Sequence, residues 1–282
     1  MAAPALSTPF QPYVYQSPQA VVTPFQILGG EAQVLQIMLK PHEKVITRTG
    51  SMCYMSEAIQ TETNGAGENA GNVIWQWLFG KLDALTTYVY SGTQDGYIGL
   101  AAPSLARILP IDLAVFGGEI ICQRDSFLCS INDVSVSPVA TRRARPGMFG
   151  SEGFFMQKLV GRGLAFITAG GSIIQKNLAR GEVLVVDAGC LVAMTREVEL
   201  ELKYAGPFKR AFFGSENLLQ ANLTGPGVVF VQSLPLFRLA QKIARAMTAP
   251  HVRDNPRFFV QIAIIFIVAY ITIVSSLLLT DQ

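Results

Sequence analysis

One serine of the sequence has surroundings that suggest catalysis: Ser151 lies in MFGSEGFF, residues 148–155. A nucleophile elbow reads G-x-S-x-G, with glycines two residues before and two after the serine, so that a strand and a helix can pack closely. Here Gly150 is adjacent to Ser151, and Phe149 occupies the position of the first glycine. The pattern therefore indicates a tight turn in which Ser151 bonds to backbone amides, and it argues against a hydrolase nucleophile.

Two histidines and four cysteines are the other residues that could do chemistry. A metal site on β-strands needs two or three histidines that converge with a carboxylate, whereas His42 precedes a strand and His251 lies far away in the sequence. The cysteines lack CxxC or zinc-site spacing, so we expect reduced thiols that fill the core. They are Cys53, Cys122, Cys129 and Cys190. The sequence predicts no catalytic residue, metal site or cofactor, and His42 is expected in a surface turn.

Two loop-like stretches could contact a partner. Residues 63–72, TNGAGENAGN, are rich in glycine but lack the lysine and hydroxyl residue of a phosphate-binding loop, so we expect a flexible insertion. Residues 141–147, TRRARPG, concentrate Arg142, Arg143 and Arg145. Nucleic-acid binding would need more positive charge or interleaved aromatic residues, and the net charge is only +2. The three arginines favour contact with an acidic partner or anionic lipid, with a solvated loop as the alternative.

Internal repeats organise most of the chain. Residues 149–167 align without a gap to residues 213–231, as FGSEGFFMQKLVGRGLAFI against FGSENLLQANLTGPGVVFV. A second phrase occurs three times, beginning at Glu43, Glu119 and Glu182; its copies are EKVITRTGSMCYM, EIICQRDSFLCSI and EVLVVDAGCLVAM. In each copy a glutamate opens an apolar run, a turn of small residues follows, and a second apolar run returns.

Two apolar runs around a two-residue turn predict a β-hairpin in each copy of this phrase. The expected register places Ile46 opposite Cys53, Cys122 opposite Cys129 and Val185 opposite Val192. These equivalent positions support cysteine as a core residue. Further strands are predicted ahead of the hairpins, over residues 32–39, 96–102 and 163–169.

The repeats predict an all-β fold of three similar units, each a β-sandwich or a short double-stranded β-helix. The expected units are residues 25–80, 81–150 and 151–214, and residues 215–235 are expected to supply closing strands that pair with the first unit. Such closure into a pseudo-threefold ring would remove unpaired sheet edges. Residues 1–24 are rich in proline and contain no basic residue, so we expect a disordered segment without a targeting signal.

A basic amphipathic helix is predicted after the β domain, over residues 236–247. Its apolar face comprises Leu239, Ala240, Ile243 and Met247. Its basic residues are Arg238, Lys242 and Arg245, and Arg253 and Arg257 follow in a linker that extends to residue 257. Such a helix can lie on anionic lipid headgroups, and packing against the β domain is the alternative.

Residues 258–280, FFVQIAIIFIVAYITIVSSLLLT, contain no formal charge and predict a membrane-spanning helix. At about 1.5 Å rise per residue, about 23 residues slightly exceed the roughly 30 Å hydrocarbon core of a bilayer. Basic residues precede the segment and only Asp281 and Gln282 follow it, so the positive-inside rule places the β domain in the cytosol. This arrangement is typical of a tail-anchored protein of the endoplasmic reticulum or the mitochondrial outer membrane.

Four motifs between residues 25 and 235 resemble a known family, the altered inheritance of mitochondria protein 24 family. The motifs are GSMCYMSEAIQTET, GGEIICQRDSFLCS, GSEGFFMQKLVGRGLAFI and GEVLVVDAGCLVAM. The resemblance implies a fold like that of the tryptophan RNA-binding attenuator protein (TRAP), which is a short double-stranded β-helix. It also implies a non-enzymatic role in mitochondrial membrane organisation. The likeness of fold implies no RNA or tryptophan site.

Together these features predict a non-enzymatic, tail-anchored membrane protein that acts as a scaffold or interaction module. The expected partners are a membrane, through one span, and other proteins, and the sequence does not favour nucleic acid. The alternative is a β module that binds lipid or a small molecule at a membrane surface, which would require a pocket with converging polar groups.

Overall fold

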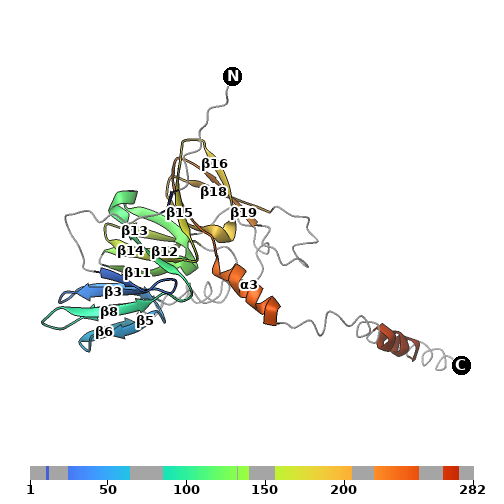
Figure 1. Cartoon of the computed structure of the whole chain (residues 1–282), viewed down its shortest axis with the longest axis horizontal. Coiled ribbons are helices and arrows are strands. Elements are labelled where there is room, and N and C mark those ends of the chain that lie inside the picture. Colours follow the sequence, from blue (N-terminus) through green and yellow to red (C-terminus); the bar gives the residue numbers. More distant parts are fainter. Residues whose placement is uncertain are drawn as a thin grey trace, which may run out of the picture. The chain divides into compact units, whose positions relative to one another are not determined.

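Antiparallel β-strands make up most of the structure, and helices follow near the C-terminus (Figure 1). The structure is a computed structural model and describes residues 11–12, 25–63, 85–131, 133–139, 156–204, 219–247 and 263–272. The chain divides into two parts, residues 1–237 and residues 238–282. The described strands all lie in the first part, which confirms the prediction of an all-β domain.

Three modules of six strands follow one another in this first part. Module 1 comprises β3 (Val34–Leu39), β4 (Lys44–Arg48), β5 (Met52–Met55), β6 (Ile59–Thr63), β7 (Leu85–Tyr90) and β8 (Gly96–Ala101). Module 2 comprises β9 (Arg107–Asp112), β10 (Glu119–Gln123), β11 (Phe127–Ile131), β12 (Val134–Val139), β13 (Met156–Gly161) and β14 (Leu164–Ala169). Module 3 comprises β15 (Ile173–Leu178), β16 (Val183–Asp187), β17 (Leu191–Thr195), β18 (Glu199–Tyr204), β19 (Leu219–Thr224) and β20 (Gly227–Gln232). The remaining elements of this part are β1 (Gln11–Pro12), β2 (Phe25–Leu28) and the 3-10 turns η1 (Leu113–Phe116), η2 (Arg124–Ser126) and η4 (Ala188–Cys190).

The strands pair in the same antiparallel pattern in every module. In module 1 the first strand pairs with the sixth, the second with the fifth, the third with the sixth and the fourth with the fifth. Modules 2 and 3 repeat this pattern. Each module therefore consists of two three-stranded half-sheets, one built from its first, third and sixth strands and the other from its second, fourth and fifth strands.

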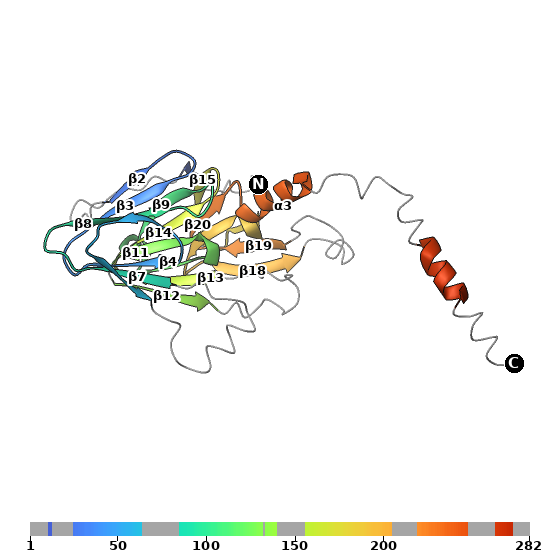
Figure 2. The same ribbon diagram turned by 90° about the horizontal axis from the view of Figure 1, so that it is seen from below.

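Neighbouring modules share sheets, because the second strand of one module pairs with the third strand of the next. β4 pairs with β11 with Thr47 opposite Cys129, and β10 pairs with β17 with Cys122 opposite Ala193. The first junction creates a six-stranded sheet, in which Figure 2 shows β7, β4, β11 and β14 side by side. The second creates a seven-stranded sheet that also includes β1. A four-stranded sheet (β2-β3-β8-β5) and a three-stranded sheet (β16-β19-β18) remain.

Three apolar cores fill the space between these four sheets. Core 1 joins the four-stranded sheet to the six-stranded sheet, core 2 joins the six-stranded to the seven-stranded sheet, and core 3 joins the seven-stranded to the three-stranded sheet. The two inner sheets have a core on each face, so β11 and β17 are buried at every residue. Strand β3 of an outer sheet instead alternates between half-buried and buried residues, because only one of its faces meets a core.

An aromatic side chain of the following module enters each of the first two cores. Phe166 of β14 is fully buried in core 1, where its ring meets Phe25 edge-on with 5.0 Å between the ring centroids. Phe230 of β20 is fully buried in core 2 and meets Phe116 edge-on at 5.8 Å. Each phenylalanine therefore ties its own module to the preceding one.

Module 1 has glycine at the position of these two phenylalanines. Both phenylalanines pair with the residue that follows a bulge in the third strand, which is Cys129 in module 2 and Ala193 in module 3. The corresponding pair in module 1 is Tyr54 and Gly99. The Tyr54 ring lies where a side chain on Gly99 would lie. Module 1 thus has no phenylalanine at this position, and the aromatic side chain on the outer face of its sixth strand is that of Tyr97, which is 45% exposed.

The predicted hairpins are wrong, because the two apolar runs of each phrase belong to different sheets. β4 and β5, β10 and β11, and β16 and β17 are the strands concerned, and none of these pairs is hydrogen-bonded in the described sheets. The small residues between them form a corner at which the chain crosses to another sheet, and η2 and η4 supply this corner in modules 2 and 3. Cys122 and Cys129 therefore do not face each other: Cys129 lies in core 1 and Cys122 in core 2.

The modules also begin and end at different residues from the predicted repeats. Their bounds are residues 34–101, 107–169 and 173–232. Residues 219–232 thus complete module 3 and pair within it, so the described strands do not form the expected closed ring. The FGSE phrases fall between the fourth and fifth strands of a module and outside the described residues, as does the turn predicted for Ser151. Of the segment expected to be disordered, residues 11–12 form β1, which pairs with β15.

Two helices are described near the C-terminus. α3 (Leu236–Met247) has the bounds that the amphipathic pattern predicts. A second helix covers residues 263–272, inside the segment 258–280 for which a membrane-spanning helix is predicted. No helix among the described residues is both long enough and apolar enough to cross a bilayer. The predicted span is therefore not supported as such, and its residues 258–262 and 273–280 lie outside the described residues.

Candidate functional site

The structure describes only some of the residues predicted to contact partners or lipid. Outside the described residues lie Arg142, Arg143, Arg145, Arg253 and Arg257. The other three basic residues, Arg238, Lys242 and Arg245, belong to α3. The predicted contacts of the arginine loop and of the linker therefore stay predictions.

α3 combines basic residues with exposed apolar side chains. Lys242 is exposed, and Ile243 and Met247 are 50% and 78% exposed. The helix sequence, LFRLAQKIARAM, contains no acidic residue. Helices of this type bind anionic bilayer surfaces, because the basic side chains attract headgroups while the apolar side chains enter the acyl boundary.

The helix over residues 263–272 exposes apolar side chains around its whole circumference. Its sequence is AIIFIVAYIT, and every one of its residues is exposed. Ile265, Phe266 and Tyr270 are 65%, 71% and 69% exposed. The hydroxyl of Thr272 donates to the Ala269 carbonyl oxygen at 2.8 Å. A helix that is apolar on all sides is stable when protein or lipid covers it.

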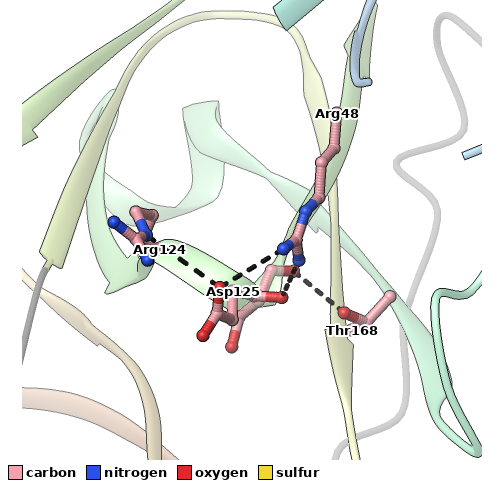
Figure 3. A network of polar contacts seen from close by, with 5 residues as sticks. Arg48, Arg124, Asp125 and Thr168 are labelled. Atoms are coloured by element: carbon pink, nitrogen blue, oxygen red, sulfur yellow. Dashed lines mark hydrogen bonds and ion pairs between the residues drawn. The ribbon is translucent and has the colours of Figure 1, made fainter. Parts of the chain in front are cut away.

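A polar network holds the corner of module 2 against module 1 (Figure 3). The Arg48 guanidinium on β4 donates from Nη1 to the Asp125 carbonyl oxygen at 3.1 Å and from Nη2 to the Asp125 carboxylate at 3.3 Å. Arg124 Nε lies 4.0 Å from the same carboxylate, and Thr168 Oγ1 donates to the Ser126 carbonyl oxygen at 3.2 Å. Figure 3 shows the two arginines on opposite sides of Asp125. Because the two Arg48 contacts join module 1 to module 2 at a sheet crossing, we assign the network a structural role.

At the corner of module 3, the side-chain amides of two glutamines hold the corner backbone in place. Gln123 Nε2 donates to the Ala188 carbonyl oxygen at 2.8 Å, across the junction between modules 2 and 3. Gln232 Nε2 donates to the Gly189 carbonyl oxygen at 3.0 Å, and its Oε1 accepts from the Gly170 amide at 2.8 Å. Side-chain hydrogen bonds to corner backbone groups thus recur at both junctions and fix the sheet crossings.

A nearly buried ion pair lies at the start of β16. Lys176 Nζ is 2.8 Å from Glu182 Oε1, and the Lys176 side chain is only 3% exposed. Glu182 Oε2 accepts from the Ala179 amide at 2.9 Å, and Glu43 accepts in the same way from the Lys40 amide at 2.8 Å in module 1. The hydrogen bond from Lys176, and then that from the Ala179 amide, lower the pKa of Glu182. The glutamates that open two of the repeated phrases therefore close turns.

We expect the Glu182 carboxylate to make the fold less stable in acid. Its folded-state pKa lies below the ordinary value of 4.5, so the unfolded chain binds the proton first. The stabilisation is therefore complete at neutral pH and is lost as the pH falls from about 4.5 through the folded-state pKa. Glu182→Gln should lower the urea midpoint at neutral pH and weaken its dependence on acid. Circular dichroism at a series of pH values measures this.

Glu201→Gln is the matched control for this prediction, because the Glu201 side chain is 49% exposed on the same outer sheet. It should leave the acid dependence unchanged. An acid dependence of the Glu182→Gln protein as steep as that of the wild type would contradict the assignment.

The cysteines divide into buried and accessible thiols. Cys122 and Cys129 are fully buried, and burial raises the pKa of Cys122 to about 12 and that of Cys129 well above its ordinary value. Their prediction as core residues is confirmed, whereas Cys53 is exposed and Cys190 is half-buried. Within the described ranges, no three His, Cys, Asp or Glu side chains are placed to hold a metal ion. His42 is exposed in a turn with a φ of 70°, as predicted.

Sequence reasoning missed the module junctions, although a signal for them exists. The strands FLCSI (β11) and LVAMT (β17) carry apolar side chains at neighbouring positions rather than at every second one. Such runs are typical of strands that are buried on both faces. A hairpin with one solvated face would alternate between apolar and polar residues. The consecutive apolar residues therefore indicated inner sheets shared by two units.

Comparisons with known proteins agree with this architecture. The chain is similar to the crystal structure of protein SPYM3_0169 from Streptococcus pyogenes, with a TM-score of 0.64 and 22% sequence identity. The similarity covers 79% of this chain and 99% of that chain, and it shows a common fold. No curated protein matches significantly. The model of the family described as "Mitochondrial biogenesis AIM24" matches residues 25–234, which include all three modules. The chain therefore belongs to the mitochondrial biogenesis AIM24 family.

Proposed function

We propose that this chain is a non-enzymatic scaffold whose C-terminal residues hold its β domain at a membrane. The observation that carries the proposal is the helix over residues 263–272, whose apolar side chains are exposed on all sides. Exposure of apolar surface to water costs about 25 cal/mol per Å², and burial in hydrocarbon removes this cost. The surrounding segment, residues 258–280, contains no formal charge, so its insertion as a span requires no buried charge.

The basic residues of α3 support the proposal, because they can bind the anionic headgroups at the bilayer surface. These residues are Arg238, Lys242 and Arg245. Each Lys or Arg near an anionic surface contributes about 1 kcal/mol of attraction. Basic residues on the N-terminal side of a span also favour a cytosolic position for what precedes it, so the proposed orientation places the β domain in the cytosol.

The β domain suits binding better than chemistry. Its three cores are occupied by apolar side chains, and the polar networks around Asp125 and Gln232 serve the junctions between modules. A rigid body of this kind presents loops to partners. We assign the loop with Arg142, Arg143 and Arg145 to contacts with an acidic protein partner. Binding of a lipid or small molecule inside a module has less support, because the three cores of the described residues consist of buried apolar side chains without converging polar groups.

Membrane attachment is tested by extraction with alkaline carbonate. The wild-type protein should stay in the membrane pellet, and deletion of residues 258–282 should release it completely to the supernatant. Insertion of the segment depends on its apolar character, so Ile267→Lys combined with Ile271→Lys should also release it, because each central lysine costs about 2.5–3.5 kcal/mol. Ile267→Leu combined with Ile271→Leu is the matched control and should stay in the pellet. A deletion protein that remains in the pellet would refute the proposed anchor.

Family membership points the scaffold towards mitochondrial biogenesis. We therefore propose the mitochondrial outer membrane as its location, with the endoplasmic reticulum as the competing destination. A fluorescent protein fused to the N-terminus leaves the C-terminal segment free. Its overlap with an outer-membrane marker would support the mitochondrial location, and a reticular pattern would contradict it.

A further inference from the structure

The first and last modules each leave a half-sheet without its neighbour. Among the described strands, β5 pairs with β8 alone and β16 pairs with β19 alone. β5 is the third strand of module 1, and β16 is the second strand of module 3. Inside the chain, these are the two strand types that pair at a junction between modules. The described sheets therefore have one free edge of each type, β5 in module 1 and β16 in module 3.

Both internal junctions use the same register, which defines what a third junction of this kind would be. The partner residue on the third strand is the one after the bulge, Cys129 or Ala193, and in module 1 this residue is Tyr54. The partner residue on the second strand is Thr47 or Cys122. A backbone hydrogen bond that all three modules share identifies the equivalent positions on their second strands, β4, β10 and β16. The carbonyl oxygens of Glu43, Gly118 and Glu182 each accept from the last residue of the fifth strand or the one after it.

Counting four residues on from these carbonyl groups gives Thr47, Cys122 and Val186. The junction rule therefore places Val186 of one chain opposite Tyr54 of another. It places Val185 opposite Met55 in the neighbouring pair, as Ile46 lies opposite Ser130 within the chain.

The two free edges are apolar and exposed. Met52 and Met55 on β5 are 41% and 36% exposed, and Val183 and Val185 on β16 are 57% and 53% exposed. Natural edge strands are usually protected by lysine, proline or a bulge. The strand sequences MCYM and VLVVD contain neither lysine nor proline. β5 has a bulge, but β11 and β17 have the same bulge and still pair at the junctions.

Exposure on β5 contrasts with complete burial at the internal junctions. The residue before the bulge is Met52 in module 1, and its equivalents Phe127 and Leu191 are 2% and 0% exposed. The bulged residue Cys53 is exposed, whereas its equivalents Leu128 and Val192 are 0% exposed. At these positions β5 is exposed, as expected of a junction strand whose partner module is missing.

We propose that a second copy of this chain covers these edges, with β16 of one copy pairing antiparallel with β5 of the next. The three-stranded sheet of one copy and the four-stranded sheet of the next would then form a seven-stranded sheet. Its strand order would be that of the sheet that joins modules 2 and 3, with β2 in the place of β1. The inference rests on strand pairing and exposure alone and is independent of membrane attachment. The contact is heterologous, since each copy uses a different surface at each end, so it propagates into a closed ring or a fibre.

Charged substitutions on the edges test the assembly in the full-length protein in a mild detergent. Light scattering with size-exclusion chromatography should give a protein mass of several times 30.6 kDa for the wild type. Val185→Lys and Met55→Lys should each reduce it to a single chain, because a lysine would be buried in the new sheet. Val115→Lys, at a 68% exposed position in η1, is the matched control and should leave the assembly intact. Circular dichroism checks that every variant is folded.

Disulfide trapping tests the register. In a background of Cys53→Ser and Cys190→Ser, a protein with Val185→Cys is mixed with one that carries Met55→Cys. Directly opposite Cβ atoms lie about 4.5–5.5 Å apart in an antiparallel pair, close to disulfide geometry, whereas diagonal ones lie about 7–8 Å apart. The mixture should therefore form a dimer band on oxidation, and a control mixture of Val183→Cys with Met55→Cys should not. A wild type that stays a single chain, lysine variants that remain assembled, or equal trapping in both mixtures would overturn the proposal.

Discussion

Replacement of Phe166 by alanine is expected to destabilise the β domain by about 3–5 kcal/mol, the usual cost of removing a fully buried aromatic side chain. Phe166 belongs to module 2, but it is fully buried in core 1 and its ring meets Phe25. The cavity would therefore lie between two modules. We expect loss of stability and also looser contact between modules 1 and 2.

Two measurements separate these effects in the full-length protein in detergent. The urea midpoint, followed by circular dichroism, should fall strongly for Phe166→Ala and little for Val115→Ala, which changes an exposed side chain. Hydrogen exchange should accelerate most in β4 and β11, because these strands form the junction. An unchanged midpoint would show that Phe166 does not join the modules.

Phe230→Ala is expected to cost a similar 3–5 kcal/mol, but at the other junction. Phe230 of module 3 is fully buried in core 2, and its ring meets Phe116 of module 2. The sheet at this junction pairs β10 with β17, so the accelerated hydrogen exchange should move to these two strands. The chemical change is the same as in Phe166→Ala, and only its location differs.

The double variant gives a further test of the two separate cores. Phe166 and Phe230 belong to different cores, so their destabilisations should add to within about 0.5 kcal/mol. If the double variant were destabilised by much less than the sum of the two single variants, one cavity alone would already separate all three modules. An exchange pattern that is identical in the two single variants would contradict the assignment of one phenylalanine to each junction.

Features set by local sequence were predictable. α3 has the bounds that its apolar and basic spacing predicts, because a helix hydrogen-bonds within its own segment. The strand expected at residues 96–102 is β8 (Gly96–Ala101), since alternating apolar residues between turns are a local pattern. The repeat was also visible, as was the burial of Cys122 and Cys129.

Features set by distant partners were not predictable. A turn of small residues between two apolar runs fits both a hairpin and a corner between sheets, and the choice depends on strands far away in the sequence. The sequence alignment of the repeated phrases was also shifted by one residue in module 2. It pairs Glu119 with Glu43, whereas Gly118 occupies the backbone position equivalent to Glu43. The predicted partner-contact loop with Arg142 and the predicted membrane-facing linker with Arg253 lie outside the residues that the structure describes.

The glycine at position 99 makes a contact between two chains weaker than the contacts between modules within one chain. Inside the chain, every junction is fastened by a phenylalanine that one module inserts into the other. At the free end Gly99 offers no such side chain, and Tyr54 folds back over it, with its hydroxyl donating to Gln36 at 2.9 Å. A contact made there between two chains would rest on backbone pairing, a few methionine and valine side chains and the half-exposed ring of Tyr97, without a fully inserted phenylalanine. Chains would then leave one assembly and join another faster than the modules within a chain separate.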